Sequence, residues 1–292
     1  MKRLSSLILT ACLSCAGIAG AADQTVVQDG IAVKPLPVWR KLASEQQLEQ
    51  DAALQYTALL TSASEKKALA PPNHPQLIRL RAIAKRMIPY TARWNPDAAK
   101  WDWQVNLLAS KQINAFCMPG GRIAFFTGII DTLNLTDDEI AAVMGHEITH
   151  ALREHGRERA VKGLGTQVAA RLGAGVAAYF GFDPGVANSV AQQAGELVVL
   201  KFSRDDEREA DLVGLDLAAR AGYDPRAGIG LWQKMEALNQ RQPFEFMSTH
   251  PSDADRIARI EQNINLLLPL YARAKGVQVA QLPAYTTTAL TK

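Results

Sequence analysis

The chain has 292 residues, of which 48% are hydrophobic and 21% are charged. This is the composition of a folded globular protein, and it excludes a disordered or collagen-like chain. The formal net charge is only +3 and no segment is strongly basic, so the sequence does not support a nucleic-acid-binding function.

Residues 1–22 have the layout of a secretory signal, with a basic start, an apolar run and then small residues. We expect cleavage after Ala21 or Ala22 and export of the mature protein to the periplasm. An alternative is a lipobox that ends at Cys12, which would leave an acylated cysteine and anchor the protein at the outer membrane. Either way Cys117 is interpreted as a small buried apolar residue.

Residues 23–75 are interpreted as an extended and helical lead-in. The prolines of "VKPLPVW" favour extended backbone, whereas apolar residues recur at helical spacing over 45–69 and again over 75–90. Two strand-like runs follow, "WQVNLLA" and "GRIAFFTGII". The "MPGG" before the second run predicts a hairpin turn, because consecutive glycines permit positive backbone angles.

The segment "TDDEIAAVMGHEITHALREH" predicts a helix that carries a metal motif. Thr136 and Glu139 have the spacing of a capping box, which sets the start of the helix. His146 and His150 are four residues apart, so both imidazoles project from one face and can reach one metal ion. Glu147 would stand beside the metal as a general base. The competing interpretation is two surface histidines on a helix.

A catalytic zinc usually has three protein ligands and one open position. The metzincin ligand is missing, because Arg153 and Gly156 occupy its positions. His155, nine residues after His146, is assigned to the opposite side of the helix and to solvent. The segment "SRDDEREAD" places Glu207 and Asp211 on one helical face, where one carboxylate could bind metal and the other hold a ligand histidine. By spacing alone, two solvent-facing carboxylates fit equally well.

These motifs resemble the zinc endopeptidase family that includes HtpX, BepA and the CaaX prenyl proteases, and in type they are most similar to periplasmic members such as BepA and LoiP. The resemblance rests on "HEITH", "SRDDEREAD", the hairpin "NAFCMPGGRIAFFTGII" and "STHPSDADRIARI". It implies one zinc per chain, with Glu207 as the third ligand and Asp211 as the carboxylate behind a ligand. The implied fold is a mainly helical, zincin-like α+β domain with a small sheet before the metal-motif helix.

The resemblance also implies how substrate would bind. Asn114, Ala115 and Phe116 would line the cleft, where a strand edge pairs with an extended peptide, although they suit ordinary sheet core as well. His250 and Arg256 would stabilise the oxyanion of the transition state. Alternatively, His250 takes the open zinc position and keeps the enzyme latent.

We expect the peptidase domain to span 76–275 and a loose tail to span 276–292. Residues 163–200 are rich in small residues and predict two helices near the cleft, either a lid or a membrane-surface element, without a membrane span. The expected function is an envelope endopeptidase that acts on unfolded or misassembled envelope proteins. The alternative is a chaperone-like or assembly protein with a latent or structural zinc site.

Overall fold

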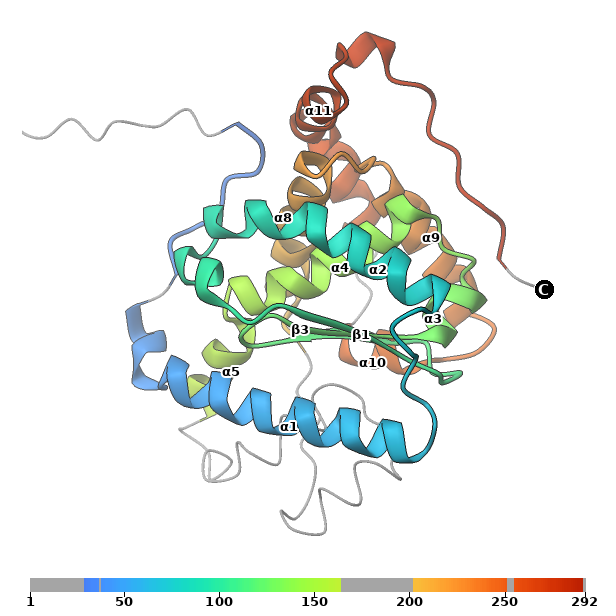
Figure 1. Ribbon diagram of the computed structural model, residues 1–292. Helices are drawn as coiled ribbons and strands as arrows, with labels where there is room; N and C mark the ends of the chain where they lie inside the picture. The colour runs from blue at the N-terminus through green and yellow to red at the C-terminus, as the bar shows by residue number, and fades with distance from the viewer. Residues whose placement is uncertain (1–28, 37, 164–201, 251–254, 291–292) are drawn as a thin grey trace, which may run out of the picture.

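The computed structural model describes residues 29–36, 38–163, 202–250 and 255–290. Within these residues the chain is mainly helical with one small sheet, which confirms the predicted α+β class (Figure 1). The predicted signal segment lies outside the described residues. So do residues 164–200 of the small-residue stretch.

Two helices precede the sheet, as the apolar spacing predicted. Helix α1 spans Glu45–Glu65 and begins after Ser44, whose hydroxyl accepts the backbone N–H of Gln47. Helix α2 spans Pro75–Met87 and begins after His74. Both helices end sooner than the expected 69 and 90. The 3₁₀ segments η1, η2 and η3 complete this half at Val38–Leu42, Ile88–Arg93 and Pro96–Lys100.

The sheet has three strands in the order β1-β3-β2. Strand β1 pairs in parallel with β3, and β2 pairs with β3 as an antiparallel hairpin. The hairpin turn contains Gly120 and Gly121 with φ of 79° and 81°, as the glycine pair predicted. The second strand-like run was expected to be longer, but after Phe126 the chain turns into helix α3. The bounds are Gln104–Leu108 for β1, Ala115–Met118 for β2, Arg122–Phe126 for β3 and Thr127–Thr132 for α3.

The sheet is covered on both faces, which explains why its strands are apolar at consecutive positions. Figure 1 shows α1 on one side and α2, α4 and α8 on the other. Alternate side chains divide accordingly. One set packs in the core with α2 and α4, and consists of Val105, Leu107, Ala115, Cys117, Ile123 and Phe125. The other set packs with α1, and consists of Leu108, Phe116, Met118, Ala124 and Phe126.

In the part of the chain that the structure describes, six helices follow the sheet and its short α3. They are α4 (Asp137–Leu152), α5 (His155–Gly163), α8 (Arg204–Arg220), α9 (Ala227–Asn239), α10 (Glu245–Thr249) and α11 (Asp255–Lys275), with a 3₁₀ turn η5 at Val279–Gln281. Helices α4 and α8 lie very close at Gly145 and Gly214. A Cβ on Gly145 would stand 2.4 Å from the carbonyl oxygen of Gly214. This contact brings together the two helices that carry the predicted metal ligands.

The C-terminal tail is docked, so the expectation of a loose end is wrong for the described residues up to 290. Arg226 donates to the carbonyl of Pro283 at 2.7 Å, and Lys234 donates to the hydroxyl of Thr288 at 2.7 Å. The same Lys234 pairs with Glu139 at 2.8 Å, where both side chains are buried. The tail therefore supplies polar partners for an ion pair that would otherwise be incompletely hydrogen-bonded.

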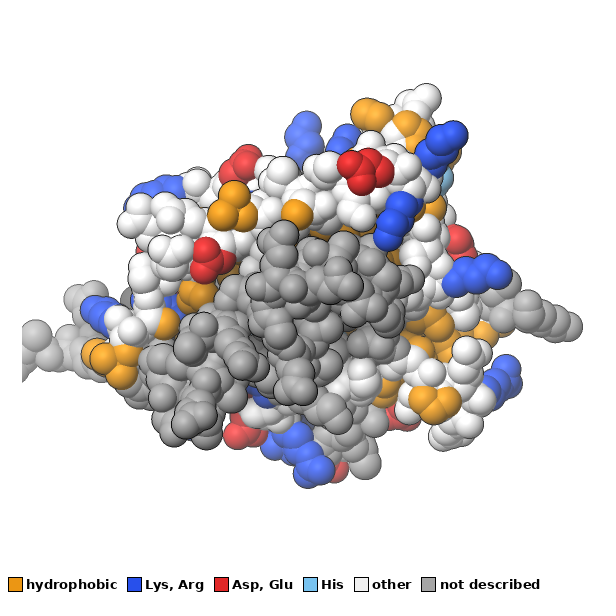
Figure 2. Space-filling model, turned by 90° about the horizontal axis from the view of Figure 1, so that it is seen from below, with side chains coloured by type: hydrophobic (Ala, Val, Ile, Leu, Met, Phe, Trp, Pro, Cys, Tyr) orange, Lys and Arg blue, Asp and Glu red, His pale blue; other side chains and the backbone are white. Residues whose placement is uncertain are grey.

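Among the described helices, none combines the length and hydropathy that a bilayer crossing requires. Seen from the side of α1, lysine and arginine side chains are dispersed among acidic and hydrophobic ones on the visible part of the surface (Figure 2).

Candidate metal centre

Helix α4 presents the metal motif from a well-defined start. The Thr136 hydroxyl accepts the N–H of Glu139, and the Glu139 carboxylate accepts the N–H of Thr136, so the predicted capping box is present. Every residue of the helix from Glu139 to Leu152 is buried. His146, Glu147 and His150 are 3%, 3% and 4% exposed, which excludes the alternative of two surface histidines.

Four side chains bring one donor atom each to the same point. His146, His150, Glu207 and His250 place these atoms within 4.8 Å of one another. The Nε2 atoms of His146 and His150 are 3.1 Å apart. The carboxylate of Glu207, from the first turn of α8, lies 3.5 Å from each of them. The two helices thus form the predicted set of two imidazoles and a carboxylate.

His250 joins this cluster from the end of α10. Its Nδ1 is 3.0 Å from Glu207 Oε1 and 3.2 Å from His146 Nε2, and its Nε2 is 3.6 Å from Glu147 Oε1. The ring therefore stands where a fourth ligand would, between the three predicted ligands and the predicted base. Of the two roles expected for His250, this position resembles the latent one.

Asp211 lies one helical turn beyond Glu207 and accepts a hydrogen bond from Nδ1 of His146 at 3.0 Å. Arg256, in the first turn of α11, donates to both oxygens of Asp211 at 2.6 and 2.7 Å. It also donates to Glu207 Oε2 at 2.9 Å. The guanidinium is 2% exposed and stacks 3.5 Å from the ring centre of Trp232.

This geometry gives Arg256 a positioning role, and the oxyanion role expected for it stays a prediction. Its Nε, Nη1 and Nη2 each donate to one of two carboxylates, and its planar face stacks on an indole. It holds Glu207, the predicted third ligand, and Asp211, the carboxylate that contacts His146. Bidentate pairing with a carboxylate is the arrangement for which a guanidinium is best suited.

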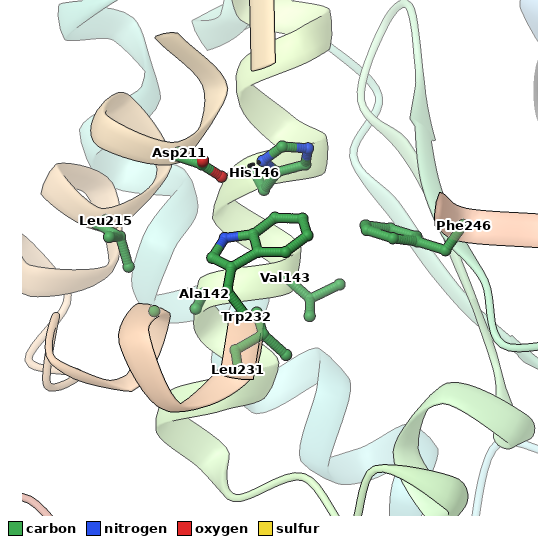
Figure 3. A pocket seen from close by; sticks show the side chains of 9 residues that line it. Ala142, Val143, His146, Asp211, Leu215, Leu231, Trp232 and Phe246 are labelled. Carbon is green, nitrogen blue, oxygen red and sulfur yellow. Dashed lines mark hydrogen bonds and ion pairs between the residues drawn. The ribbon is translucent and has the colours of Figure 1, made fainter. Parts of the chain in front are cut away.

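Aromatic rings enclose the imidazoles. Phe202 stacks on His150 with ring centres 3.6 Å apart, and Phe246 stacks on His250 at 4.4 Å. Figure 3 shows Trp232 and Phe246 on either side of the space next to His146. The cavity there measures about 10 Å³, room for one water at most. It is a packing gap beside the ligand, too small to be a substrate subsite.

The charges of the cluster favour a divalent cation. Three buried carboxyls, those of Glu147, Glu207 and Asp211, face one buried guanidinium, that of Arg256. With neutral imidazoles, two negative charges are left without a counter-ion in a medium where an unpaired charge is costly. Nitrogen and carboxylate donors in this number are typical of zinc. The residues present therefore fit one Zn²⁺.

Burial and the neighbouring charges also shift the pKa values of His146, Glu147 and His150. Burial opposes protonation of His146, but hydrogen bonds to Asp211 and Glu207 outweigh it and raise its pKa to about 9. Burial and the neighbouring His146 hold the pKa of His150 well below its usual value. Burial raises the pKa of Glu147. The Oε1 atom of Glu147 also has no hydrogen-bond partner within the described residues, as expected for a group that awaits a reactant.

The prediction that His155 is a solvated residue is wrong. It is 2% exposed, and its Nδ1 lies 3.0 Å from Nδ1 of His150. The prediction extended one straight helix through 155. In fact α4 ends at Leu152, and Glu154 adopts a left-handed φ of 54°, which returns the chain to the metal side.

The predicted substrate residues Asn114, Ala115 and Phe116 are 2%, 1% and 2% exposed. Their side chains belong to the interior, and Phe116 packs edge-on against Tyr56. A peptide would have to contact the backbone of β2, which is an edge strand of the sheet in the part of the chain that the structure describes. Their substrate role stays a prediction.

The sequence is similar to those of known proteins. Residues 76–264 match the sequence profile of Peptidase family M48, and this range includes every residue of the candidate metal centre. The mitochondrial metalloendopeptidase OMA1 of Schizosaccharomyces pombe is 30% identical over 226 residues, covering 75% of this chain and 60% of that protein. The metalloprotease LoiP of Escherichia coli is 29% identical over 205 residues, covering 68% and 75%.

The β-barrel assembly-enhancing protease of E. coli is 24% identical over 209 residues, which is 69% of this chain and 42% of that protein. The chain spans only 60%, 31% and 59% of the length of the OMA1 relatives from S. pombe, Arabidopsis thaliana and Saccharomyces cerevisiae. The family match covers more than half of the chain and contains the whole candidate metal cluster, so this protein belongs to peptidase family M48.

Proposed function

We propose that the protein is a zinc-dependent endopeptidase. The observation that supports this most strongly is the position of Glu147, whose buried Oε1 makes no hydrogen bond and lies beside a set of donors suited to zinc. A closed structural site has no use for a base at this position. The named relatives are metalloendopeptidases and metalloproteases, which is consistent with the proposal.

In this proposal each side chain has a defined task. A zinc ion held by His146, His150 and Glu207 would supply Lewis-acid activation of water and of the scissile carbonyl. Glu147 accepts a proton from the attacking water while the water oxygen bonds to the carbonyl carbon. It then gives that proton to the amide nitrogen as the C–N bond breaks. The raised pKa of Glu147 suits this exchange, because it makes the carboxylate a stronger base toward the attacking water.

We further propose that the described conformation is latent. His250 reaches into the ligand cluster, and a fourth protein ligand would fill the position that substrate and water need. Activation would then require His250 to move away from Glu207. Once displaced, its imidazole would remain close enough to the centre to donate to the developing oxyanion.

The substrate class is proposed from the relatives and from the predicted signal. One relative is named for enhancing β-barrel assembly, and residues 1–22 predict export. We propose that this protein cleaves unfolded or misassembled envelope proteins in the periplasm. A peptide would add to the outer edge of β2 near Ala115 and Phe116.

Association with the membrane surface, or an anchor at Cys12, belongs to the same proposal. Mass spectrometry of the mature N-terminus distinguishes cleavage at Ala21 or Ala22 from acylation at Cys12.

The second candidate is an assembly factor or chaperone-like protein whose zinc site is permanently closed. The observation that favours it is again His250, which would complete a four-ligand site. The two candidates differ in whether the site opens and whether Glu147 matters.

The deciding experiment measures cleavage of unfolded casein by the zinc-loaded chain, with and without a chelator, beside Glu147→Gln and His250→Ala. We expect Glu147→Gln to lose about 10²- to 10⁴-fold in rate, because it removes the general base, while zinc content stays near one per chain. We expect His250→Ala to raise basal cleavage. Equal proteolysis by wild type and Glu147→Gln would eliminate the endopeptidase. No proteolysis even in His250→Ala would favour the assembly factor.

A further inference from the structure

We propose that His155 is a positioning residue for the metal ligand His150, and that Glu209 anchors it. The inference rests on the zinc site of the proposed function. The structure places a hydrogen-bonded chain of imidazole, imidazole and carboxylate behind His150.

The distances define this chain. Nε2 of His150 faces the ligand cluster, 3.1 Å from Nε2 of His146. Its other nitrogen, Nδ1, is 3.0 Å from Nδ1 of His155. Nε2 of His155 is in turn 2.9 Å from Oε2 of Glu209. Both imidazoles are almost fully buried, at 4% and 2% exposed, so water does not compete for these contacts.

The chemistry fixes the direction of every hydrogen bond. A neutral imidazole that gives Nε2 to a metal carries its proton on Nδ1. Nδ1 of His150 must therefore donate, and Nδ1 of His155 must accept. The proton of His155 then lies on Nε2, where it donates to Glu209. A carboxylate at the end of the chain is consistent with these directions, since an ionised carboxylate accepts hydrogen bonds and cannot donate them.

Glu209 is itself held in place by Arg153. Nη2 of Arg153 donates to Oε1 of Glu209 at 3.1 Å, and its Nε lies 3.1 Å from Oε2 as an ion pair. The same Nη2 donates to the carbonyl of Lys34 at 2.6 Å. The anchor is thus fixed by a residue that also holds the N-terminal segment on the domain.

The turn between α4 and α5 brings His155 into this position. Glu154 has a φ of 54°, a region that non-glycine residues rarely occupy. Its carboxylate pairs with Arg157 at 2.9 Å, and both side chains are buried. A costly backbone conformation persists only where surrounding contacts hold it. Here its effect is to reverse the chain so that His155 faces His150.

A hydrogen-bond acceptor behind a ligand imidazole fixes its tautomer and ring orientation, and removing such a partner typically costs about 10- to 100-fold in metal affinity. The test measures zinc affinity of the full chain by competition with a chromophoric chelator. We expect His155→Leu, which keeps bulk but accepts no hydrogen bond, to bind zinc about 10- to 100-fold more weakly. We expect His155→Asn to recover most of this loss, because its Oδ1 can accept near the place of Nδ1.

The matched control is His74→Ala, which removes a histidine at the start of α2 that none of the metal-centre contacts involves. Its zinc affinity should equal that of wild type. Circular dichroism confirms that each variant is folded. If wild type binds one zinc and folded His155→Leu binds it equally well, the inference fails while the proposed function stands. If wild type binds no zinc, both fail.

A spectroscopic measurement separates positioning from simple packing. In the zinc-loaded protein, nitrogen-15 correlation spectra of the histidine rings should identify His150 as protonated on Nδ1 and His155 as protonated on Nε2. A merely structural His155 has no reason to hold one tautomer. Finding its proton on Nδ1 would overturn the proposal.

Discussion

The two ligand imidazoles on α4 have the same chemistry but different supports. His146 donates directly to Asp211, whose carboxylate is gripped by the buried Arg256. His150 donates to His155, and only the second step of that chain reaches a carboxylate, Glu209. The first support is short, ionic and built from two long helices. The second is longer and depends on a tight turn.

This difference has a physical consequence. Arg256 and Asp211 are 2% and 5% exposed, so removing the Asp211 charge leaves a buried guanidinium with Glu207 as its remaining carboxylate partner, which is costly. The Glu209 side chain is 24% exposed, and its charge is partly compensated by solvent. We therefore expect the support of His146 to matter for both folding and metal binding. The support of His150 should matter mainly for metal binding.

The largest expected effect is that of Asp211→Ala. It removes two of the three carboxylate hydrogen bonds of the buried Arg256 guanidinium, leaving only the one to Glu207, and it removes the acceptor of His146. We expect the free energy of unfolding of the metal-free protein to fall by about 3–5 kcal/mol. Zinc affinity should fall by about 100-fold, the upper end for a residue behind a ligand. Urea unfolding and chelator competition measure the two quantities.

His155→Leu is the matching variant in the support of His150, and it should lower the free energy of unfolding much less than Asp211→Ala does. Asp211→Asn keeps the shape and one acceptor, so it should fall between wild type and Asp211→Ala. An unfolding free energy equally lowered by Asp211→Ala and His155→Leu would remove the distinction between the two supports.

A smaller effect is expected from Gly145→Ala, which acts on both supports at once. The added Cβ would meet the Gly214 carbonyl at 2.4 Å, so α4 and α8 must separate. Overpacking of this kind costs about 1–3 kcal/mol, partly offset by the better helix propensity of alanine, worth about 1 kcal/mol. Zinc affinity should fall too, because α8 carries Glu207 and Asp211.

Gly230→Ala is the control for this prediction, because it is also a helical glycine and its Cβ would meet only side chains at 3.3 Å or more. It should leave zinc affinity unchanged and be neutral or slightly stabilising. Unchanged zinc affinity and stability in Gly145→Ala would show that the helices can adjust without disturbing the centre.

Local rules were sufficient for much of the fold and for part of the metal centre. The capping box at Thr136 gave the start of α4, and the glycines at 120 and 121 gave the hairpin turn. Helical spacing placed His146 and His150 on one face. Four-residue spacing paired Glu207 with Asp211, although choosing between them as ligand needed the family resemblance.

The support of His150 depends on features that local rules do not encode. The left-handed residue at the α4–α5 turn is Glu154, not glycine or asparagine, so nothing in the sequence marks the turn that redirects His155. Glu209 differs from other acidic residues of its helix only by what it meets in space. The Gly145 and Gly214 contact is also invisible until the two helices are packed. The docked tail likewise depends on distant partners such as Lys234.

The smallest expected effect concerns protons, and it distinguishes the two imidazoles before any metal binds. Hydrogen bonds to Asp211 and Glu207 raise the pKa of His146 to about 9 against the effect of burial, whereas burial and His146 lower that of His150. At pH 7.5, below the raised pKa, metal-free His146 carries a proton that zinc must displace, and His150 carries none. We expect release of about one proton per zinc, declining as the pH rises through about 9.

Calorimetry of zinc binding in two buffers of different ionisation enthalpy counts this proton. Asp211→Asn should release less at pH 7.5, because loss of the carboxylate charge lowers the pKa of His146. His155→Leu should release as much as wild type, since His150 has no proton to lose. If Asp211→Asn and wild type release the same number, the proton does not come from His146, and the ionic support does not set the protonation of its ligand.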